Sequence, residues 1–263
     1  IAEAEAVASA AGMAYQGAHP VVALYATFLN RGFDQLLMDV ALHRAGVTVV
    51  LDRAGVTGAD GASHNGVWDI AMCSMIPGLR LAAPRDEQTL RARLREALDV
   101  DDAPTVIRYR KGSLPEPMPA LRSVGGVDIL FDEAEADSPA RVLIVGTGAC
   151  APDAIEAARR LAAAGVRVTV ADPQWMIPIC PELATLVRDY DCVVSVEDGI
   201  VQGGFGWSLR DAVAETGVPV RCLGVPQGFP EHGERAAMIA QFGFDADGIE
   251  RAARELVERI GER

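Results

Sequence analysis

Positive charge is scarce in this sequence of 263 residues, in which 24 lysines and arginines stand against 37 aspartates and glutamates. The net charge of −13 argues against nucleic acid and anionic membrane surfaces as partners, because proteins that bind either usually carry an excess of cations. A phosphate ligand stays possible, since an acidic protein can hold one in a local cationic pocket. Aromatic residues are also few, and Ala, Val, Leu and Gly dominate the apolar half of the sequence, as is typical of sheets covered by helices.

Cysteine is sparse and unclustered. The five cysteines form no CxxC pair, which argues against a disulfide framework or zinc site and favours reduced thiols in the cytoplasm. No apolar run has the length of a membrane span, and no signal peptide is visible, so we expect no membrane partner. Because the sequence starts at Ile1, inside a helical pattern and without Met, we expect it to be part of something longer.

Helical and strand patterns alternate along the sequence, which predicts largely parallel sheets wrapped by helices. The expected helices cover residues 1–17, 27–46, 86–99, 151–165, 181–190, 207–217 and 245–260. The expected strands cover residues 20–25, 47–52, 78–84, 105–109, 141–146, 166–172, 192–198 and 218–224. Prolines, a Gly-Gly pair and an acidic run break this rhythm over residues 112–139. We therefore predict an α/β fold of two parallel-sheet α/β domains, residues 1–122 and 140–263, joined by a linker at 123–139.

A glycine-rich loop after the second expected strand is the strongest candidate for a functional site. The strand ends in Asp52 and Arg53, and a loop with three glycines then presents Asp60 and His64. Glycines permit backbone angles and close approaches that side chains forbid. Open α/β sheets bind their ligands at such strand ends, so the loop is predicted to be part of a binding or active site.

Cationic side chains follow other strands of the same expected sheet. Tyr25 ends one strand, and Arg108, Arg110 and Lys111 follow the last one. Because strand ends converge on one edge, Arg53 with either Lys111 or Arg110 would form a cationic clamp for a phosphate. The alternative is a solvated basic rim.

Two other glycine-rich segments have competing interpretations. Residues 146–151 lie between an expected strand and helix, and Asp172 ends the next strand, which together match the GxGxxA variant of a dinucleotide-binding fingerprint. The alternative is an ordinary strand-to-helix turn, and Pro173 directly after the aspartate weakens a ribose-binding role. The glycine cluster at residues 199–206 is expected to be a turn or a contact between subunits.

Two glutamates stand near the start of the opening helix. Glu3 and Glu5 suit that position electrostatically, because acids are favoured at the positive end of a helix. Alternatively, one of them is a buried carboxylate that hands a proton to a ring nitrogen, and their spacing does not choose between the two.

Several motifs, in their order along the chain, resemble the later portion of the 1-deoxy-D-xylulose-5-phosphate synthase family. They are IAEAEA, YATFLNRGFDQ, DRAGVTGADGASHNG, AAPRDE, IRYRKG and DPQWMIP. That family belongs to the transketolase-like thiamine diphosphate enzymes, which have three α/β domains. The resemblance spans the whole chain and implies that the chain corresponds to the last two of these three domains. They are a pyrimidine-binding domain at residues 1–122 and a transketolase C-terminal domain at 140–263.

The resemblance implies thiamine diphosphate as the cofactor. Glu3 matches the glutamate that hydrogen-bonds the aminopyrimidine ring in that family, and Phe28 matches the aromatic residue that packs against the ring. Nothing here resembles the GDG…N segment that holds Mg²⁺ and the diphosphate, so no metal ligand is expected within this chain.

The resemblance also implies a phosphorylated substrate. Tyr25, Arg53 and Lys111 match positions that hold the acceptor's phosphate. The matching polar positions around substrate and intermediate are Arg31, Asp60 and His64, with His64 as the proton shuttle. The implied reaction joins pyruvate to glyceraldehyde 3-phosphate with loss of carbon dioxide.

With the diphosphate-binding portion absent, the resemblance implies a partner. It would be a separate diphosphate-binding chain or a missing N-terminal region, in a cytoplasmic homodimer or heterotetramer.

Departures from the family pattern gather near the expected site. Ala4 and Glu5 replace a Gln and a His beside the cofactor, and a buried Glu5 next to Glu3 would make the two carboxylates raise each other's pKa. Lys111 replaces a more usual arginine, which keeps the charge but loses the bidentate fork. Ala26, Gly32 and Arg110 also depart from the common residues. A split enzyme with another donor or acceptor and a non-catalytic paralogue therefore stay as alternatives.

Overall fold

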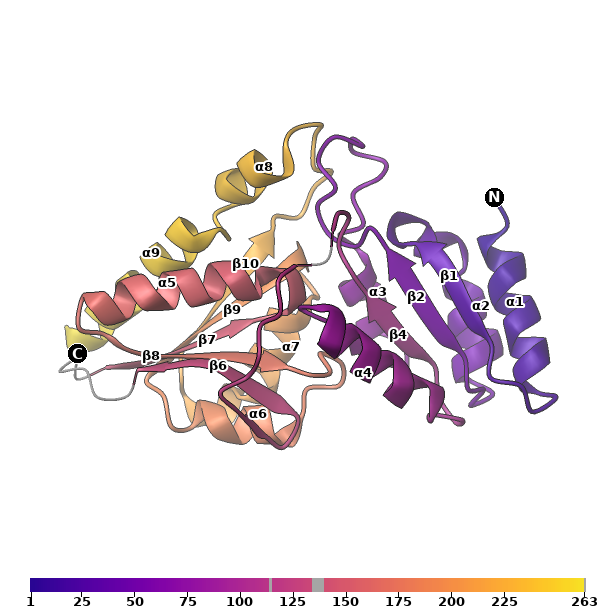
Figure 1. Cartoon of the computed structure of the whole chain (residues 1–263), viewed down its shortest axis with the longest axis horizontal. Helices are drawn as coiled ribbons and strands as arrows, with labels where there is room; N and C mark the ends of the chain where they lie inside the picture. The colour runs from indigo at the N-terminus through magenta and orange to yellow at the C-terminus, as the bar shows by residue number, and fades with distance from the viewer. Residues whose placement is uncertain (114, 134–139, 263) are drawn as a thin grey trace.

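Two sheets, each built mainly from parallel strands, form the centre of the fold (Figure 1). The computed structural model describes residues 1–113, 115–133 and 140–262. Each sheet has helices on both of its faces, and the two sheets lie end to end with the N-terminus at the far side of the first (Figure 1). This confirms the predicted α/β class.

The first sheet is fully parallel, in the order β1-β2-β4-β3. Its strands are β1 (Val21–Tyr25), β2 (Thr48–Asp52), β3 (Arg80–Ala82) and β4 (Thr105–Arg108). The two inner strands, β2 and β4, are short runs rich in β-branched apolar residues and are largely buried between helices, as inner parallel strands require. The helices around them are α1 (Glu3–Ala14), α3 (Asp69–Ser74) and α4 (Glu87–Leu98). α4 starts where predicted, since Asp86 accepts the Thr89 N–H at 2.8 Å in a reciprocal capping box.

The single helix expected over 27–46 is instead an irregular series of helical turns. It comprises the 3₁₀ segment η1 (Ala26–Arg31), the short α2 (Phe33–Gln35) and the π-helical η2 (Leu36–Ala41). The break falls at Gly32, where a Cβ would come within 3.2 Å of the Glu3 carbonyl oxygen. The chain therefore bends to pass close to the start of α1, which places η1 beside that helix.

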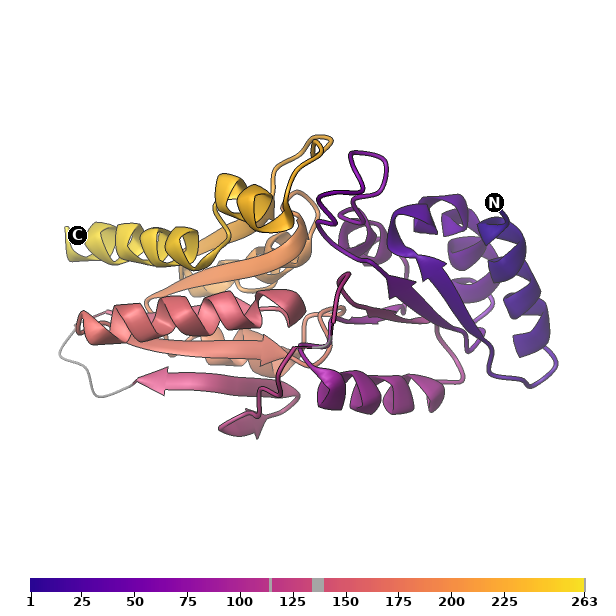
Figure 2. The same ribbon diagram turned by 45° about the horizontal axis from the view of Figure 1, so that its top comes forward.

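The second sheet has the order β10-β9-β7-β8-β6-β5. Its strands are β5 (Arg122–Val124), β6 (Val127–Glu133), β7 (Arg141–Gly146), β8 (Arg167–Pro173), β9 (Cys192–Ile200) and β10 (Val220–Val225). One face is covered by α5 (Ala151–Ala163) and α9 (Ala246–Gly261), which lie side by side (Figure 2). The other face is covered by α6 (Pro181–Val187) and α7 (Phe205–Ala212). The short α8 (Arg235–Phe242) precedes α9, and the 3₁₀ turns η3 (Gly148–Cys150) and η4 (Ala214–Thr216) complete the domain.

The expected linker at 123–139 is wrong over much of its length, because β5 and β6 form an antiparallel hairpin within it. Gly125 and Gly126 do not break the chain's order but are the two residues of the hairpin turn, with φ of 52° and 87°. β6 then pairs antiparallel with β8, so the hairpin belongs to the second sheet. Residues 134–139 of the expected linker lie outside the described residues.

The two sheets share one apolar core and a strand-like contact. Leu81 in the middle of β3 accepts the Met176 N–H at 2.7 Å and donates its own N–H to the Ile177 carbonyl at 3.0 Å. Side chains of both sheets and of α6 and α7 belong to a single buried cluster that includes Leu81, Met176 and Phe205. The relative placement of the two domains is therefore fixed by buried contacts.

Candidate active site

The carboxyl ends of β1, β2 and β4 meet at one edge of the first sheet (Figure 1). Tyr25 at the end of β1 is level with Asp52 of β2, so Arg53 follows directly beside it. Lys111 comes shortly after the end of β4. The parallel register therefore brings Tyr25, Arg53 and Lys111 to one edge, as predicted.

The glycine-rich loop leaves this edge as a closed ring of chain. Gly55 and Gly66 exchange two backbone hydrogen bonds of 2.7 and 2.9 Å, which close the loop at its base. Gly55, Gly58 and Gly61 have φ of 83°, 72° and 79°. At Gly58 a Cβ would lie 2.6 Å from the Gly233 carbonyl oxygen, so the C-terminal domain touches the loop there. Arg53 is itself left-handed, with φ of 58°, where the chain turns from β2 into the loop.

Asp60 is the centre of a polar cluster at this edge. Its Oδ2 accepts the Tyr25 hydroxyl at 3.0 Å, and its Oδ1 lies 2.7 Å from Lys111 Nζ. The hydrogen bonds from Lys111 and Tyr25 lower the pKa of Asp60. Partial burial and the bond to Asp60 raise the pKa of Tyr25 to about 12, so its hydroxyl stays a hydrogen-bond donor. The Arg53 guanidinium lies over the same tyrosine ring, 4.7 Å from its centroid.

Three rings pack together next to this cluster. The centroid of His64 lies 5.6 Å from those of Tyr25 and of Phe28, and the last two are 5.3 Å apart. His64 Nδ1 lies 2.8 Å from the Ser63 hydroxyl, which leaves Nε2 as the ring nitrogen for another partner. The position of His64 is thus fixed by its contacts with the two aromatic rings and by the hydrogen bond to Ser63.

Glu3 extends the cluster to the start of α1. Arg31 lies over the Phe28 ring at 4.4 Å and places its NH1 3.7 Å from Glu3 Oε1. Glu3 Oε2 is buried and has no hydrogen-bond partner among the described residues. A buried carboxylate oxygen without a partner costs free energy, so such an atom indicates a ligand that would satisfy it.

The structure separates the two glutamates that the sequence left open. Glu5 is exposed, and its carboxylate accepts the Ser9 hydroxyl at 3.1 Å on the outer side of α1. Glu5 is therefore not buried beside Glu3, because residues two apart on a helix point about 200° away from each other.

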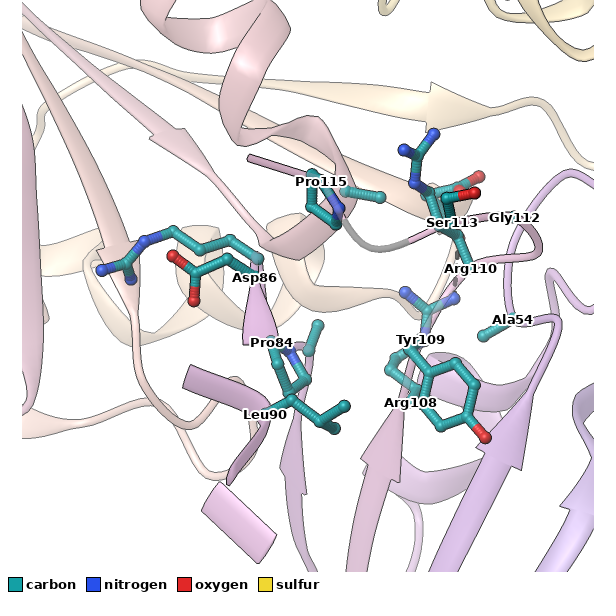
Figure 3. A pocket seen from close by; sticks show the side chains of 14 residues that line it. Ala54, Pro84, Asp86, Leu90, Arg108, Tyr109, Arg110, Gly112, Ser113 and Pro115 are labelled. Carbon is teal, nitrogen blue, oxygen red and sulfur yellow. Dashed lines mark hydrogen bonds between the residues drawn. The ribbon is translucent and has the colours of Figure 1, made fainter. Parts of the chain in front are cut away.

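The other two cations after β4 do not join the cluster. Arg108 is buried and forms a bidentate pair with Asp69, at 2.7 and 3.2 Å, and also donates to the Asp198 carbonyl at 2.8 Å. Arg110 contributes to the lining of a cavity of about 200 Å³ between the two sheets. Figure 3 shows Arg108, Tyr109 and Arg110 on one side of that cavity and Pro84 and Leu90 on another. Lys111 is thus the residue that accompanies Arg53, and none of the eight site residues that the family resemblance implied lines the cavity.

The dinucleotide interpretation is wrong. Asp172 is buried and bonded to Arg85 NH1 at 3.0 Å, so its carboxylate is committed to a contact between the domains. A Cβ on Gly148 would lie 2.8 Å from the Ala83 carbonyl oxygen, so the turn packs directly on the first domain. The glycine cluster at 199–206 is a turn, as one alternative held, in which Glu197 accepts the N–H groups that begin α7.

Sequence reasoning missed the residues that hold the loop. Thr27 donates to the Ser63 carbonyl at 3.0 Å, and Asn65, next to His64, is fully buried and bonds four other residues. The signal for Asn65 was an amide placed inside a glycine loop, where asparagine often bonds nearby backbone.

Within the described ranges, no group of three or more His, Cys, Asp or Glu side chains is arranged to hold a metal ion. The same ranges contain no helix with the length and apolar character needed to cross a bilayer.

Comparison with known proteins gives a consistent family assignment. Residues 1–117 match the transketolase pyrimidine-binding domain, and residues 133–249 match the transketolase C-terminal domain. The chain is 52% identical over 254 residues to a 1-deoxy-D-xylulose-5-phosphate synthase of Corynebacterium glutamicum, covering 95% of this chain and 40% of that protein. It is 52% identical over 261 residues to 1-deoxy-D-xylulose-5-phosphate synthase 2 of Kitasatospora griseola, covering 98% of this chain and 41% of that one. The chain thus spans about two fifths of the length of these curated relatives.

Solved structures agree with this assignment. A split-gene transketolase, described as an inactive beta4 tetramer, superposes with a TM-score of 0.84 at 28% identity, over 98% of this chain and 82% of that chain. A transketolase from Leishmania mexicana has the same fold, with a TM-score of 0.79 at 22% identity, over 98% of this chain and 37% of that chain.

Proposed function

Because the chain belongs to the transketolase family, as its pyrimidine-binding and C-terminal domains, we propose that it is half of a thiamine diphosphate-dependent 1-deoxy-D-xylulose-5-phosphate synthase. The proposed reaction joins pyruvate to glyceraldehyde 3-phosphate with loss of carbon dioxide. One observation carries the proposal. The eight residues expected at the site form one continuous cluster, from Glu3 through Arg31, Phe28, His64 and Tyr25 to Arg53, Asp60 and Lys111.

The residues around Glu3 fit the aminopyrimidine part of the cofactor. Glu3 Oε2 is a buried oxygen without a partner in the described part of the chain, so it can hold a proton shared with a ring nitrogen, and Phe28 offers an aromatic face nearby. When bound, thiamine diphosphate supplies a nucleophilic carbon that adds to the donor ketone and takes up the electrons released with carbon dioxide. Arg31 lies 3.7 Å from Glu3 Oε1, so the arginine engages the other oxygen of the same carboxylate.

Tyr25, Arg53 and Lys111 are the proposed phosphate ligands. They combine one hydroxyl donor, one forked guanidinium and one ammonium on a single sheet edge. Lys111 is paired with Asp60 at 2.7 Å, so an entering phosphate competes with that carboxylate for the ammonium. Binding the phosphate here fixes the position of the aldehyde relative to His64.

His64 and Asp60 are proposed to serve the reacting groups of the acceptor. With Nδ1 bonded to Ser63, His64 can move a proton through Nε2 as the new carbon–carbon bond forms. Asp60 keeps Tyr25 and Lys111 aligned around that position.

Residues outside this chain are proposed to hold Mg²⁺ and the diphosphate of the cofactor. The partial coverage of the curated relatives and the likeness to a chain of a split-gene transketolase support either a separate partner chain or a further region of the same protein. We propose that the working enzyme is a cytoplasmic homodimer or heterotetramer.

The test compares Glu3→Ala with Glu5→Ala in the chain assembled with its diphosphate-binding region, thiamine diphosphate and Mg²⁺. The measurement is formation of 1-deoxy-D-xylulose 5-phosphate from pyruvate and glyceraldehyde 3-phosphate. Glu3→Ala is expected to lower turnover by about 10²-fold or more, because the proton at the ring nitrogen is lost. Glu5→Ala, on the same helix but exposed, is expected to leave turnover unchanged.

The reverse pattern would overturn the assignment of Glu3. An assembled wild-type enzyme that forms no such product would reject the proposed reaction.

A further inference from the structure

Asn65 makes the densest set of side-chain hydrogen bonds in the site loop. Its side chain is 0% exposed. Oδ1 accepts the N–H groups of Thr57 at 2.8 Å and Gly58 at 3.2 Å, while Nδ2 donates to the carbonyls of Gly61 at 3.0 Å and Pro230 at 3.3 Å. Both hydrogens and the acceptor oxygen of the amide are therefore in use.

These bonds tie together a loop whose tip is poor in apolar contacts. Residues 59, 62 and 63 are exposed, so the tip of the loop gains almost no stability from apolar burial. The Asn65 amide joins the start of the loop at Thr57 and Gly58 to its middle at Gly61. Asp60 lies in the stretch of chain between these two points. His64 is the residue directly before it, and its carbonyl accepts the Thr57 hydroxyl at 3.2 Å.

The C-terminal domain also contacts the loop through hydrogen bonds and an aromatic pair. Asp198 accepts the Val56 N–H at 2.9 Å and lies 2.8 Å from Arg235, whose guanidinium also donates to the Val56 carbonyl. Trp68, after the loop, packs edge-on against Phe229 at 5.6 Å. Pro230, in the segment between Phe229 and Arg235, supplies the carbonyl that Asn65 binds.

We infer that Asn65 is a positioning residue, through which the C-terminal domain fixes the loop that carries Asp60 and His64. All eight proposed site residues come from the first domain. The second domain would thus contribute to the reaction by positioning the loop, without placing a side chain of its own in the site. The inference rests on the proposed function of Asp60 and His64, and the geometry of the loop does not depend on it.

Asn65→Asp tests the inference by changing one group. The substitution keeps an acceptor for Thr57 and Gly58 but turns the donor into an oxygen that faces the carbonyls of Gly61 and Pro230. We expect kcat to fall by about tenfold or more in the assembled enzyme, because small displacements of reacting groups are costly. The affinity for thiamine diphosphate is expected to stay within about twofold, because Glu3 and Phe28 lie outside the loop.

The pH profile separates positioning from general damage. As pH falls, the new carboxyl group takes up a proton and regains one donor. The kcat of the variant is therefore expected to approach that of the wild type towards acid pH. Gln227→Glu is the matched control, since it adds the same charge to the exposed part of the segment before Phe229. It is expected to keep wild-type kcat at every pH.

A measurement without turnover makes the inference independent of the reaction. Amide hydrogen exchange over residues 57–64 is expected to be at least about tenfold faster in Asn65→Asp than in wild type or Gln227→Glu, because the opening free energy of the loop falls. Arg235→Gln removes the guanidinium of the C-terminal domain that donates to the Val56 carbonyl. It is expected to speed the hydrogen exchange of the same amides.

Unchanged exchange in both variants would overturn the inference, whatever the enzyme makes. Unchanged kcat in Asn65→Asp, or a loss of kcat that is equal at every pH and matched by a loss of cofactor affinity, would do so too. If exchange changes as expected but the wild type forms no 1-deoxy-D-xylulose 5-phosphate, the proposed reaction fails and the positioning of the loop stands.

Discussion

Asp60 joins two proposed phosphate ligands that would otherwise be independent side chains. Tyr25 donates to one of its oxygens and Lys111 binds the other, so one carboxylate sets the position of a phenol and an ammonium. Both partners come from other strands than the loop that carries Asp60. The distance between loop and sheet edge is therefore set at this residue.

Replacing Asp60 by Asn is expected to lower the pKa of Tyr25 from about 12 towards its ordinary value near 10. Burial of the phenol, the largest cause of the shift, stays, but the carboxylate that disfavours a second negative charge is gone. The measurement is a spectroscopic titration of tyrosinate in wild type and variant.

Glu5→Gln removes one carboxylate at an exposed place and serves as the control, with no expected change in the titration. A tyrosine titration that is the same in Asp60→Asn and wild type would contradict the described contact.

Which strand-end residues share the edge could be predicted from the sequence, but which of the neighbouring charges face it could not. Arg110 and Lys111 were both candidates for the phosphate clamp, and their contacts distinguish them, since Lys111 pairs with Asp60 whereas Arg110 lines the cavity between the sheets. In the same way, Glu3 and Glu5 differ only in their direction on α1. The choice among the charges after β4 depends on packing partners that lie far away in the sequence. Helical spacing does separate the two glutamates, because Glu3 lies on the same stripe of α1 as the buried Val7.

Among the elements, those with strong apolar periodicity were predictable and those shaped by tertiary contact were not. α4, α5 and α9 lie where the pattern placed them, and aspartates cap α4 and α9. The break at Gly32 follows from the approach of Glu3, and the β5–β6 hairpin follows from pairing with β8. Neither partner is local, so local composition suggested a helix in one case and a linker in the other.

The loop offers a matched pair of glycines with which to measure its contact with the C-terminal domain. Gly58 and Gly61 both have positive φ, but only Gly58 faces another chain segment, the Gly233 carbonyl. Gly61→Ala is expected to lower the free energy of unfolding by about 1 kcal/mol, the cost of a left-handed alanine. Gly58→Ala is expected to lose about 1 to 3 kcal/mol more, because the added methyl must displace backbone.

Denaturant unfolding of the two variants and wild type gives these free energies. Equal losses in the two variants would show that the approach of Gly233 contributes nothing.

In the whole molecule, a buried charge cluster joins the two domains. Arg85, which follows β3, lies 2.7 Å from Asp128 of β6 and 3.0 Å from Asp172 of β8. One permanent cation between two carboxylates leaves an excess negative charge in a buried place. Burial, opposed by Arg85, raises the pKa of Asp172 to about 7, whereas hydrogen bonds keep the pKa of Asp128 low despite its burial.

This cluster predicts a stability that declines as pH rises. Between about pH 4 and 7, Asp172 holds a proton in the folded protein that the unfolded chain has released. Stability is therefore complete below that window and falls through it, because the folded state binds more protons. Asp172→Asn, which cannot ionise, is expected to flatten the decline in denaturant midpoints measured across the window.

Part of the slope will remain in Asp172→Asn, since burial also raises the pKa of Glu197 to about 7. Asp211→Asn, at an exposed position, is the control and is expected to follow wild type. The same slope in Asp172→Asn and wild type would refute the assignment.

The apolar core that runs through both sheets also bears on how such a gene can divide. A break between the sheets would leave Leu81, Met176 and Phe205 facing water on two separate polypeptides, each with an aggregation-prone face. We therefore expect a chain divided at this boundary to be unstable unless its two halves associate and bury these side chains again. The two domains are expected to be inherited as one unit. Recombination between homologues should yield working chimaeras only when both sheets come from the same parent.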